Sequence, residues 1–377
     1  MRVVYLSKAL VAAAYRDKIA ALRAAGSVDV TAVFPERWAS RPAEPDPAGV
    51  PSPWLRRTPA RWTGRNHLHW YPRIGRVLDA LHPDLVHVDE EPYSLVTAQV
   101  LRLCARRGLP VVFFAWQNLS KRLPPPFHAV RRYVFGGAAG AIAGSESAAA
   151  VLRERGYRGP LALIPQFGVS LERFRPDPAL RREHRRRLGI NHAAFLVGFA
   201  GRLVREKGVD LLLAAAAGVP ALAVLLLGDG PLRPALAQTA QRLGLDSRLY
   251  ALGQLPSTDV PGWLNACDAL VLPSCATPGW REQFGRVLIE AMACGVPVVG
   301  SRSGEIPAVI GEAGLLVPEG DAAALREALQ RLVADPELAR SLASAGRCRV
   351  AQRFTQERIA EATIAFYRML LHGGDGS

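Results

Sequence analysis

The sequence predicts an α/β protein made of two halves, each built on a parallel sheet with helices packed against it. Three observations lead to this prediction. Short apolar runs alternate with amphipathic segments along the whole chain, which is the pattern of βαβ units. The apolar runs are continuous rather than alternating, as expected for strands buried on both faces. The length of 377 residues exceeds one comfortable core and fits two domains.

The expected strands are the short apolar runs that end in glycine, proline, serine or an acidic residue. In the first half they are residues 1–6, 28–34, 85–89, 110–116, 140–145 and 161–165. In the second half they are residues 195–201, 222–228, 249–253, 269–274 and 297–301. The uncharged stretch 211–228 is long enough to span a membrane, but Gly218 and Pro220 divide it. We therefore expect a buried helix followed by a buried strand there.

Domain boundaries follow from breaks in this periodicity. Glycine and three prolines interrupt the pattern over residues 164–178, so we expect an N-terminal domain over 1–168 and a C-terminal domain over 169–354. Residues 355–377 are expected to form an amphipathic helix that packs back toward the N-terminal domain, with a frayed tail. The charged segment 181–190 is interpreted as a solvated helix face, and residues 35–73 as a long loop rich in proline, arginine and tryptophan.

Composition narrows the classes of partner. The net charge of +14 suits a phosphate-bearing ligand, an anionic membrane or nucleic acid, although solvated arginines alone would also produce it. No nucleic-acid motif accompanies the charge, so no nucleic-acid partner is expected. Five scattered cysteines without a CxxC pair favour a reduced, cytoplasmic chain without disulfides or zinc. Lys8 interrupts the apolar start, which therefore predicts a first strand rather than a signal peptide.

Two loops of the second half carry features of a phosphate site. The run from Gly201 to Gly208 follows an expected strand, contains Arg202, Arg205 and Lys207, and precedes an expected helix. Ligands of open α/β sheets bind beyond the carboxyl ends of the strands, and a helix N-terminus with nearby cations favours phosphate. The alternative is a solvated basic loop. The Gly-Asp-Gly turn at residues 228–230 is a weaker signal, because such turns are often only connectors.

The strongest segment is residues 269–299, where a strand, a loop and a helix over about 286–294 succeed one another. Glu282 lies in the loop and Glu290 lies inside the otherwise apolar helix. A buried carboxylate needs partners, and it can accept two sugar or ribose hydroxyls at once. The alternative is that Glu290 pairs with an arginine. The backbone N–H groups around Phe284 and Gly285, at the helix start, could receive a diphosphate.

These motifs resemble those of the retaining GT-B-fold glycosyltransferases, group 1, particularly members that assemble bacterial polysaccharides. The resemblance rests on Glu282-Gln-Phe-Gly285 followed by Glu290-Ala-Met-Ala, on Gly201-Arg-Leu with Glu206-Lys-Gly208, and on Gly228-Asp-Gly-Pro231. It implies a GT-B fold of two Rossmann-like domains facing a donor cleft. It also implies transfer of a hexose from a UDP- or GDP-sugar to a hydroxyl of a glycan, a lipid-linked saccharide or a small molecule, with retention of anomeric configuration.

The resemblance further implies roles for individual residues. Arg202 and Lys207 would hold the donor diphosphate and Glu290 the ribose, while Leu255 would contact the base through its main chain. Glu282, with the backbone of Phe284 and Gly285, would hold the transferred sugar. Two cations and a helix dipole can neutralise the leaving diphosphate, so no metal or other cofactor is expected. The isolated His67-x-His69 and His87-x-Asp89 pairs do not form a metal-ligand cluster.

The N-terminal half departs from the family pattern. Its first βα loop reads Ser-Lys-Ala-Leu over residues 7–10, where many relatives carry a glycine pair. Where many relatives carry a histidine near the sugar, residues 114–118 read Phe-Ala-Trp-Gln-Asn. Trp116, Gln117 and Asn118 are therefore candidate sugar or acceptor contacts, as are Glu90 and Glu91, which could equally belong to a charged loop.

Competing hypotheses remain at this stage. One is an inverting GT-B enzyme or a sugar-nucleotide epimerase, and another is a non-catalytic nucleotide- or glycan-binding partner. Residues 35–73 contain several arginines and four tryptophans but only three acidic residues, which is a composition suited to an anionic lipid surface. A peripheral contact with the inner membrane is therefore one hypothesis, and a mobile loop over a soluble acceptor is the other.

Overall fold

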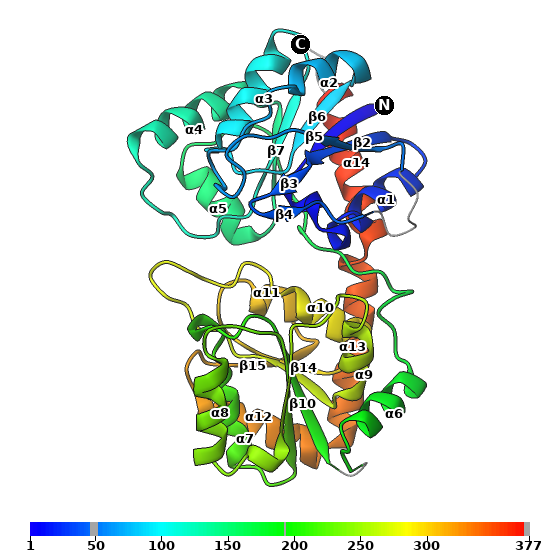
Figure 1. The fold of residues 1–377 in the computed structure, drawn as a ribbon, viewed down its shortest axis with the longest axis vertical. Coiled ribbons are helices and arrows are strands. Elements are labelled where there is room, and N and C mark those ends of the chain that lie inside the picture. The colour runs from blue at the N-terminus through cyan, green and yellow to red at the C-terminus, as the bar shows by residue number, and fades with distance from the viewer. Residues whose placement is uncertain (46–51, 192–193, 373–377) are drawn as a thin grey trace. The chain divides into compact units, whose positions relative to one another are not determined.

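A computed structural model describes residues 1–45, 52–191 and 194–372. The chain forms two compact units, one of residues 1–168 together with Gln356 onward, and one of Val169–Thr355. Each unit is built on an open parallel sheet with helices packed on it (Figure 1).

The first unit contains a seven-stranded sheet in the order β5-β2-β1-β6-β7-β8-β9. Every neighbouring pair in it is parallel. Its strands are β1 (Arg2–Leu6), β2 (Asp29–Pro35), β5 (Leu55–Thr58), β6 (Leu85–Val88), β7 (Val111–Ala115), β8 (Gly140–Ala143) and β9 (Leu161–Leu163). Its helices are α1 (Asp17–Ala24), α2 (Ile74–Leu81), α3 (Leu95–Ala105), α4 (Pro125–Gly137), α5 (Glu146–Glu154) and α14 (Gln356–His372).

Successive residues of each strand face opposite layers of the core. In β1, Val3 and Tyr5 pack in a cluster with side chains of α1 and α14, while Val4 and Leu6 pack in a second cluster with side chains of α2 and α3. This alternation explains why the strands are apolar at every position: both faces of the sheet are covered. The sequence pattern that predicted buried parallel strands is thus confirmed.

The last helix, α14, belongs to the first unit although it follows the second in sequence. It packs beside α1 (Figure 1), and the Tyr367 hydroxyl lies 2.5 Å from His87 Nδ1 of β6. Gly140 of β8 accommodates it closely, since a Cβ there would lie 2.7 Å from Leu370 Cδ1 and 2.9 Å from Phe366 Cζ. Side chains of α14 are therefore part of the core of the first unit.

The second unit contains a six-stranded parallel sheet in the order β12-β11-β10-β13-β14-β15. Its strands are β10 (Phe195–Ala200), β11 (Leu222–Leu227), β12 (Leu249–Gly253), β13 (Ala269–Leu272), β14 (Val298–Ser301) and β15 (Gly314–Val317). Its helices are α6 (Pro178–Arg187), α7 (Val209–Ala217), α8 (Arg233–Arg242), α9 (Val260–Ala266), α10 (Arg286–Ala293), α11 (Ile306–Ile310), α12 (Ala322–Ala334) and α13 (Pro336–Arg353). The chain order reverses between β10 and β13, which is where open sheets of this kind bind ligands.

All the expected strands are present, with ends that differ by one or two residues, and the divided stretch 211–228 forms the helix α7 and the strand β11. The prediction of one long loop over 35–73 is wrong for its described part. That part contains the edge strand β5 and the hairpin β3 (Arg37–Trp38) and β4 (Arg41–Pro42), while residues 46–51 lie outside the described residues. The missed strands are short, and β5 is a polar edge strand without an apolar run.

The interpretation of residues 181–190 as a solvated face is wrong for His184, Arg185 and Ile190, which are buried. On α6, His184 is buried and Arg185 is only 2% exposed. Arg185 Nη1 donates to Asp268 Oδ2 at 2.9 Å and to the carbonyl of Ala266 at 3.1 Å. A guanidinium with five donors can be buried when acceptors surround it in this way. Within the described residues, no helix combines the length and hydropathy needed to cross a membrane.

Candidate functional site

The loop after β10 is held tightly against the neighbouring strand end. A 3₁₀ turn over Arg205–Lys207 leads into Gly208, whose φ of +62° is left-handed. A Cβ on Gly208 would lie 2.1 Å from the carbonyl oxygen of Pro273, just after β13, so only glycine permits this approach. Arg202 is exposed at the start of the loop and forms no ion pair with any other described residue. The loop thus presents a free guanidinium at the carboxyl end of β10.

The Gly-Asp-Gly turn after β11 is fixed to the same loop. The N–H of Leu203 donates to the carbonyl of Asp229 at 3.0 Å, and the N–H of Leu232 donates to the carbonyl of Leu203 at 3.1 Å. A Cβ on Gly228 would lie 2.0 Å from the carbonyl oxygen of Gly201. Here the turn is therefore more than a connector, since it positions the backbone on either side of Arg202.

Glu282 meets Lys207 at the carboxyl end of the sheet. Lys207 Nζ lies 2.5 Å from Glu282 Oε2, and the same oxygen accepts a hydrogen bond from Ser274 Oγ at 3.0 Å. Lys207 Nζ also lies 5.2 Å from the centre of the Trp280 ring. Glu282 is only 6% exposed, and its carbonyl accepts the N–H of Glu305 at 3.1 Å. Two residues predicted from separate motifs are thus in direct contact.

The N-terminus of α10 follows Glu282 in the chain. Gly285 caps the helix with a φ of +78°, and Phe284 is buried with its ring edge-on to Phe354, 5.7 Å between centroids. The side chain of Phe284 is therefore a core residue, and its main chain is the part that can meet a ligand. Leu255 is half-buried just after β12, at the carboxyl ends of the strands of the same sheet. Among the described residues, neither Arg202 nor Leu255 forms a hydrogen bond or ion pair with Lys207 or Glu282.

Glu290 lies one helical turn beyond Arg286, whose Nε is 2.7 Å from Glu290 Oε1. The arginine pairing that the sequence left open as an alternative therefore exists. Burial raises the pKa of Glu290, and the charge of Arg286 opposes that rise. A carboxylate has lone pairs for several donors, so this ion pair leaves capacity for ligand hydroxyls.

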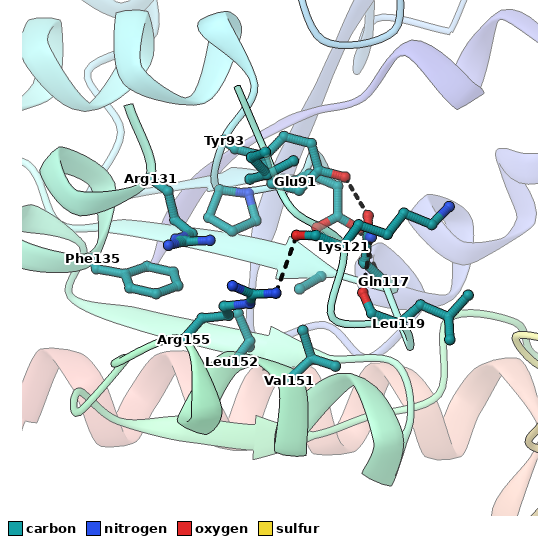
Figure 2. A pocket seen from close by; sticks show the side chains of 13 residues that line it. Glu91, Tyr93, Gln117, Leu119, Lys121, Arg131, Phe135, Val151, Leu152 and Arg155 are labelled. Atoms are coloured by element: carbon teal, nitrogen blue, oxygen red, sulfur yellow. Dashed lines mark hydrogen bonds between the residues drawn. The ribbon is translucent and has the colours of Figure 1, made fainter. Parts of the chain in front are cut away.

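In the first unit, Glu91, Trp116 and Gln117 are brought together. Glu91 Oε1 accepts the N–H groups of Trp116 at 3.0 Å and Gln117 at 2.9 Å. The Tyr93 hydroxyl donates to Gln117 Oε1 at 2.5 Å (Figure 2). Glu91 is buried, and burial raises its pKa to about 7. Asn118 is buried at the next position of the same loop. Glu91 therefore fixes the chain where it leaves β7 and is not part of an exposed charged loop.

The cavity beside Glu91 is small. Its volume is about 30 Å³, which is close to the share of one water molecule in the liquid. Arg131 and Arg155 lie around it with Lys121 (Figure 2).

Glu90 also forms a buried ion pair. Its carboxylate contacts Lys8 Nζ, and His69 Nε2 lies 3.6 Å from Glu90 Oε1. Burial raises the pKa of Glu90 to about 7 against the opposing charge of Lys8. Sequence reasoning did not assign Lys8 or Asp89 to a site. The signal was present, because three consecutive acidic residues follow a buried strand and the first βα loop carries a lysine in place of glycine.

No group of three histidine, cysteine, aspartate or glutamate side chains suited to a metal ion occurs among residues 1–45, 52–191 and 194–372. The expectation that donor handling needs no metal stays a prediction, since it concerns the reaction itself.

Comparison with known families gives a consistent result for both halves. Residues 181–349 match the family described as glycosyl transferases group 1, and residues 11–168 match the glycosyl transferase 4-like domain. A D-inositol 3-phosphate glycosyltransferase of Streptomyces bingchenggensis is 34% identical over 243 residues, which cover 60% of this chain and 52% of that protein. A GDP-mannose-dependent alpha-(1-6)-phosphatidylinositol monomannoside mannosyltransferase of Mycolicibacterium smegmatis is 35% identical over 200 residues, 50% of this chain and 52% of that protein. The matches thus span about half the length of these curated relatives.

Solved structures resemble the whole chain. Sucrose-phosphate synthase from Thermosynechococcus elongatus superposes with a TM-score of 0.76 at 24% identity, covering 99% of this chain and all of that one. HepE of Anabaena in complex with UDP superposes with a TM-score of 0.78 at 21% identity, covering 98% of this chain and all of that one. At these identities the likeness concerns the fold.

Proposed function

Because the chain belongs to the group 1 glycosyltransferases and has their GT-B fold, we propose that it transfers a hexose from a nucleotide diphosphate sugar to a hydroxyl group, with retention of anomeric configuration. The observation that carries the proposal is the contact between Lys207 and Glu282, which joins two separate sequence motifs at the carboxyl end of one sheet. UDP- and GDP-sugars are the donors proposed, and a glycan, a lipid-linked saccharide or a small molecule is the acceptor.

The diphosphate is assigned to Arg202, Lys207 and the N-terminus of α10. Arg202 is exposed at the end of β10 and has five N–H donors in a planar fork, a geometry suited to phosphate. Lys207 has three donors and can hold a phosphate oxygen while it remains bonded to Glu282. The backbone N–H groups that follow Gly285 add the positive end of the helix dipole. These groups stabilise the charge that develops on the leaving diphosphate.

The hydroxyl groups of the donor are assigned to the two glutamates. Glu282 is oriented by Lys207 and Ser274, so it can accept sugar hydroxyls in a fixed position. Glu290 is assigned to the ribose, and the main chain at Leu255 to the base. In the proposed reaction the bond between the anomeric carbon and the phosphate oxygen breaks. The acceptor oxygen then bonds to the same face of that carbon, and its proton passes to the leaving phosphate oxygen.

The test uses the full chain with a panel of UDP-, GDP-, ADP- and TDP-sugars. Hydrolysis or transfer with at least one donor is expected, and a binding-only partner would give neither. An epimerase would instead return an isomerised nucleotide sugar. The NMR spectrum of the transfer product should show the anomeric configuration of the donor, and the inverted anomer would overturn the proposal. The preferred nucleotide should raise the melting temperature, since a ligand at about 100 times its Kd stabilises by about 2.7 kcal/mol.

A further inference from the structure

The loop between β13 and α10, residues 273–285, carries a tryptophan to which the proposed function gives no role. Trp280 is half-buried, and the centre of its ring lies 5.2 Å from Lys207 Nζ. An ammonium group within about 6 Å of the centre of an aromatic ring is attracted to the face of that ring. Trp280 therefore contacts the same ammonium group that is assigned to the donor diphosphate.

The first half of this loop is bound to the loop that carries Lys207. The N–H of Cys275 donates to the carbonyl of Glu206 at 2.8 Å, and Glu206 is the residue before Lys207. The next N–H, that of Ala276, donates to Glu319 Oε2 at 2.8 Å. The loops that follow β10 and β13 are thus held at a fixed separation just where the ring meets the ammonium group.

The second half of the loop forms a tight turn. The N–H of Thr277 donates to the carbonyl of Trp280 at 2.8 Å, and the N–H of Trp280 donates back to the carbonyl of Thr277 at 3.3 Å. The backbone from which the indole extends is therefore fixed. Two residues later in the chain, Glu282 Oε2 lies 2.5 Å from Lys207 Nζ. One short segment thus supplies both a carboxylate and an aromatic ring to a single ammonium group.

These two contacts restrict a side chain that is otherwise flexible. Lysine is a point charge on a four-carbon stem, so its ammonium group has a defined position only where neighbours fix it. Glu282 accepts one of the three N–H donors of Lys207, and the Trp280 ring covers another side of the ammonium group. The Lys207 side chain is still 19% exposed, so a ligand can reach it. A group that is already in position loses less conformational freedom when a ligand binds.

We infer that Trp280 is a positioning residue of the donor site, whose ring holds the Lys207 ammonium group beside Glu282 in place for a phosphate oxygen. The inference rests on the proposed function for the identity of the ligand, whereas the contact between ring and ammonium group does not depend on it.

The first experiment titrates the full chain with UDP, GDP and inorganic pyrophosphate in a calorimeter. Trp280→Leu should weaken the binding of at least one of these probes about fivefold, the size expected for a cation–π contact that solvent partly screens. Trp280→Phe keeps an aromatic face and should weaken it only about twofold. Thr277→Ala is the matched control, because Thr277 is exposed in the same turn and the alanine keeps its backbone hydrogen bonds. If Trp280→Leu binds every probe like this control, the inference is wrong.

A double variant separates positioning from a purely structural role. In the Lys207→Met background, Trp280→Leu should cause no further loss of binding, because no ammonium group is left for the ring to hold. If Trp280 only shaped the loop, its replacement would weaken binding by the same factor with or without the lysine. An equal loss in both backgrounds would therefore overturn the inference.

NMR of the protein with ¹³C-labelled lysine tests the contact without a ligand. Few signals are expected, since the lysines of the chain are Lys8, Lys18, Lys121 and Lys207. The Lys207 signal is the one lost in Lys207→Met. Its ε-methylene protons should lie upfield because of the indole ring, and Trp280→Leu should move them toward those of the exposed Lys121. A Lys207 signal that Trp280→Leu leaves unchanged would overturn the inference. Failure of the wild type to bind any of the three probes would contradict the proposed function and the role at a phosphate, while the lysine signal would still decide whether the ring holds the ammonium group.

Discussion

Replacing Lys207 by methionine separates the structural role of the Lys207–Glu282 pair from its proposed role in donor binding. At 2.5 Å and an effective dielectric constant of 20, the Coulomb attraction of this pair is about 7 kcal/mol, most of which is offset by the desolvation of both groups. Removing one partner of a buried pair costs about 3–5 kcal/mol. The Lys207 side chain is 19% exposed, so we expect the lower end, about 3 kcal/mol.

The double variant Lys207→Met with Glu282→Gln should recover most of that stability, because no unpaired carboxylate is left. Hydrogen exchange at the amides of α7 and α10 measures this locally and does not require the two units to unfold together. Donor kcat/KM should fall ten- to hundredfold in Lys207→Met, since a charge-assisted phosphate contact is worth about 1.5–3 kcal/mol. The double variant should not recover it.

Arg202→Ala is the companion variant, because Arg202 is exposed and unpaired among the described residues. It should lower donor kcat/KM with little change in stability. Arg205→Ala is the matched control from the same loop and should leave both nearly unchanged. The reasoning about the ion pair is refuted if the losses of stability in Lys207→Met and Glu282→Gln simply add in the variant that carries both. It is also refuted if that double variant regains wild-type donor turnover.

Four further outcomes are expected. Glu290→Gln should raise the donor KM more than it lowers kcat, in steady-state assays at varied donor, and equal effects on both would contradict the ribose assignment. Gly208→Ala should cost several kcal/mol more in urea unfolding than Gly244→Ala: both glycines have left-handed φ angles, +62° and +66°, but only at Gly208 would the added Cβ meet a backbone oxygen, at 2.1 Å. The pKa of Glu91 is raised from 4.5 to about 7, so the folded state holds more protons than the unfolded state between these values. The free energy of unfolding should therefore fall as pH rises through that window, and Glu91→Gln should remove this part of the slope, at about 1.4 kcal/mol per pH unit at most; an unchanged slope would place the proton elsewhere. A peripheral membrane contact through residues 35–73 predicts co-sedimentation with anionic vesicles at low salt and its loss at high salt, whereas failure to bind at low salt would favour a soluble acceptor.

The sequence predicts best those elements whose structure follows from the pattern of a few neighbouring residues. The buried strands were located because both faces of each sheet are covered, which leaves continuous apolar runs. The edge strand β5 was missed for the same reason, since Arg56 and Arg57 are exposed in it and no apolar run marks it. Lys207 and Glu282 follow strands β10 and β13 of the same sheet, and their side chains are in contact. Their role in binding the donor stays a prediction.

Long-range partners could not be predicted in this way. From its charge alone, Arg185 is expected to face solvent. Only the fold places Asp268 and the carbonyl groups of Ala266 and Ala194 around its guanidinium. Similarly, nothing local in Lys8 indicates that it pairs with Glu90, which lies on the segment after β6. The membrane hypothesis relied on four tryptophans in residues 35–73. Two of them, Trp38 and Trp54, lie partly buried against the core of the first unit, so they do not form a fully exposed surface for a membrane.

The membership of α14 in the first unit has a consequence for biosynthesis. A ribosome makes the N-terminal residues first, and most domains acquire their structure as soon as they leave the exit tunnel. Here the side chains of Ile359, Ile364 and Phe366 complete a core that is otherwise made from residues 1–168, so these partners of that core are translated only after the whole second unit. The apolar patch on α1 and the adjacent strands stays uncovered while the whole second unit is synthesised. Nascent chains of this protein should therefore engage chaperones for longer than their early sequence alone would require, and a stop codon before Gln356 should produce an aggregation-prone product even though every residue of both donor motifs is present.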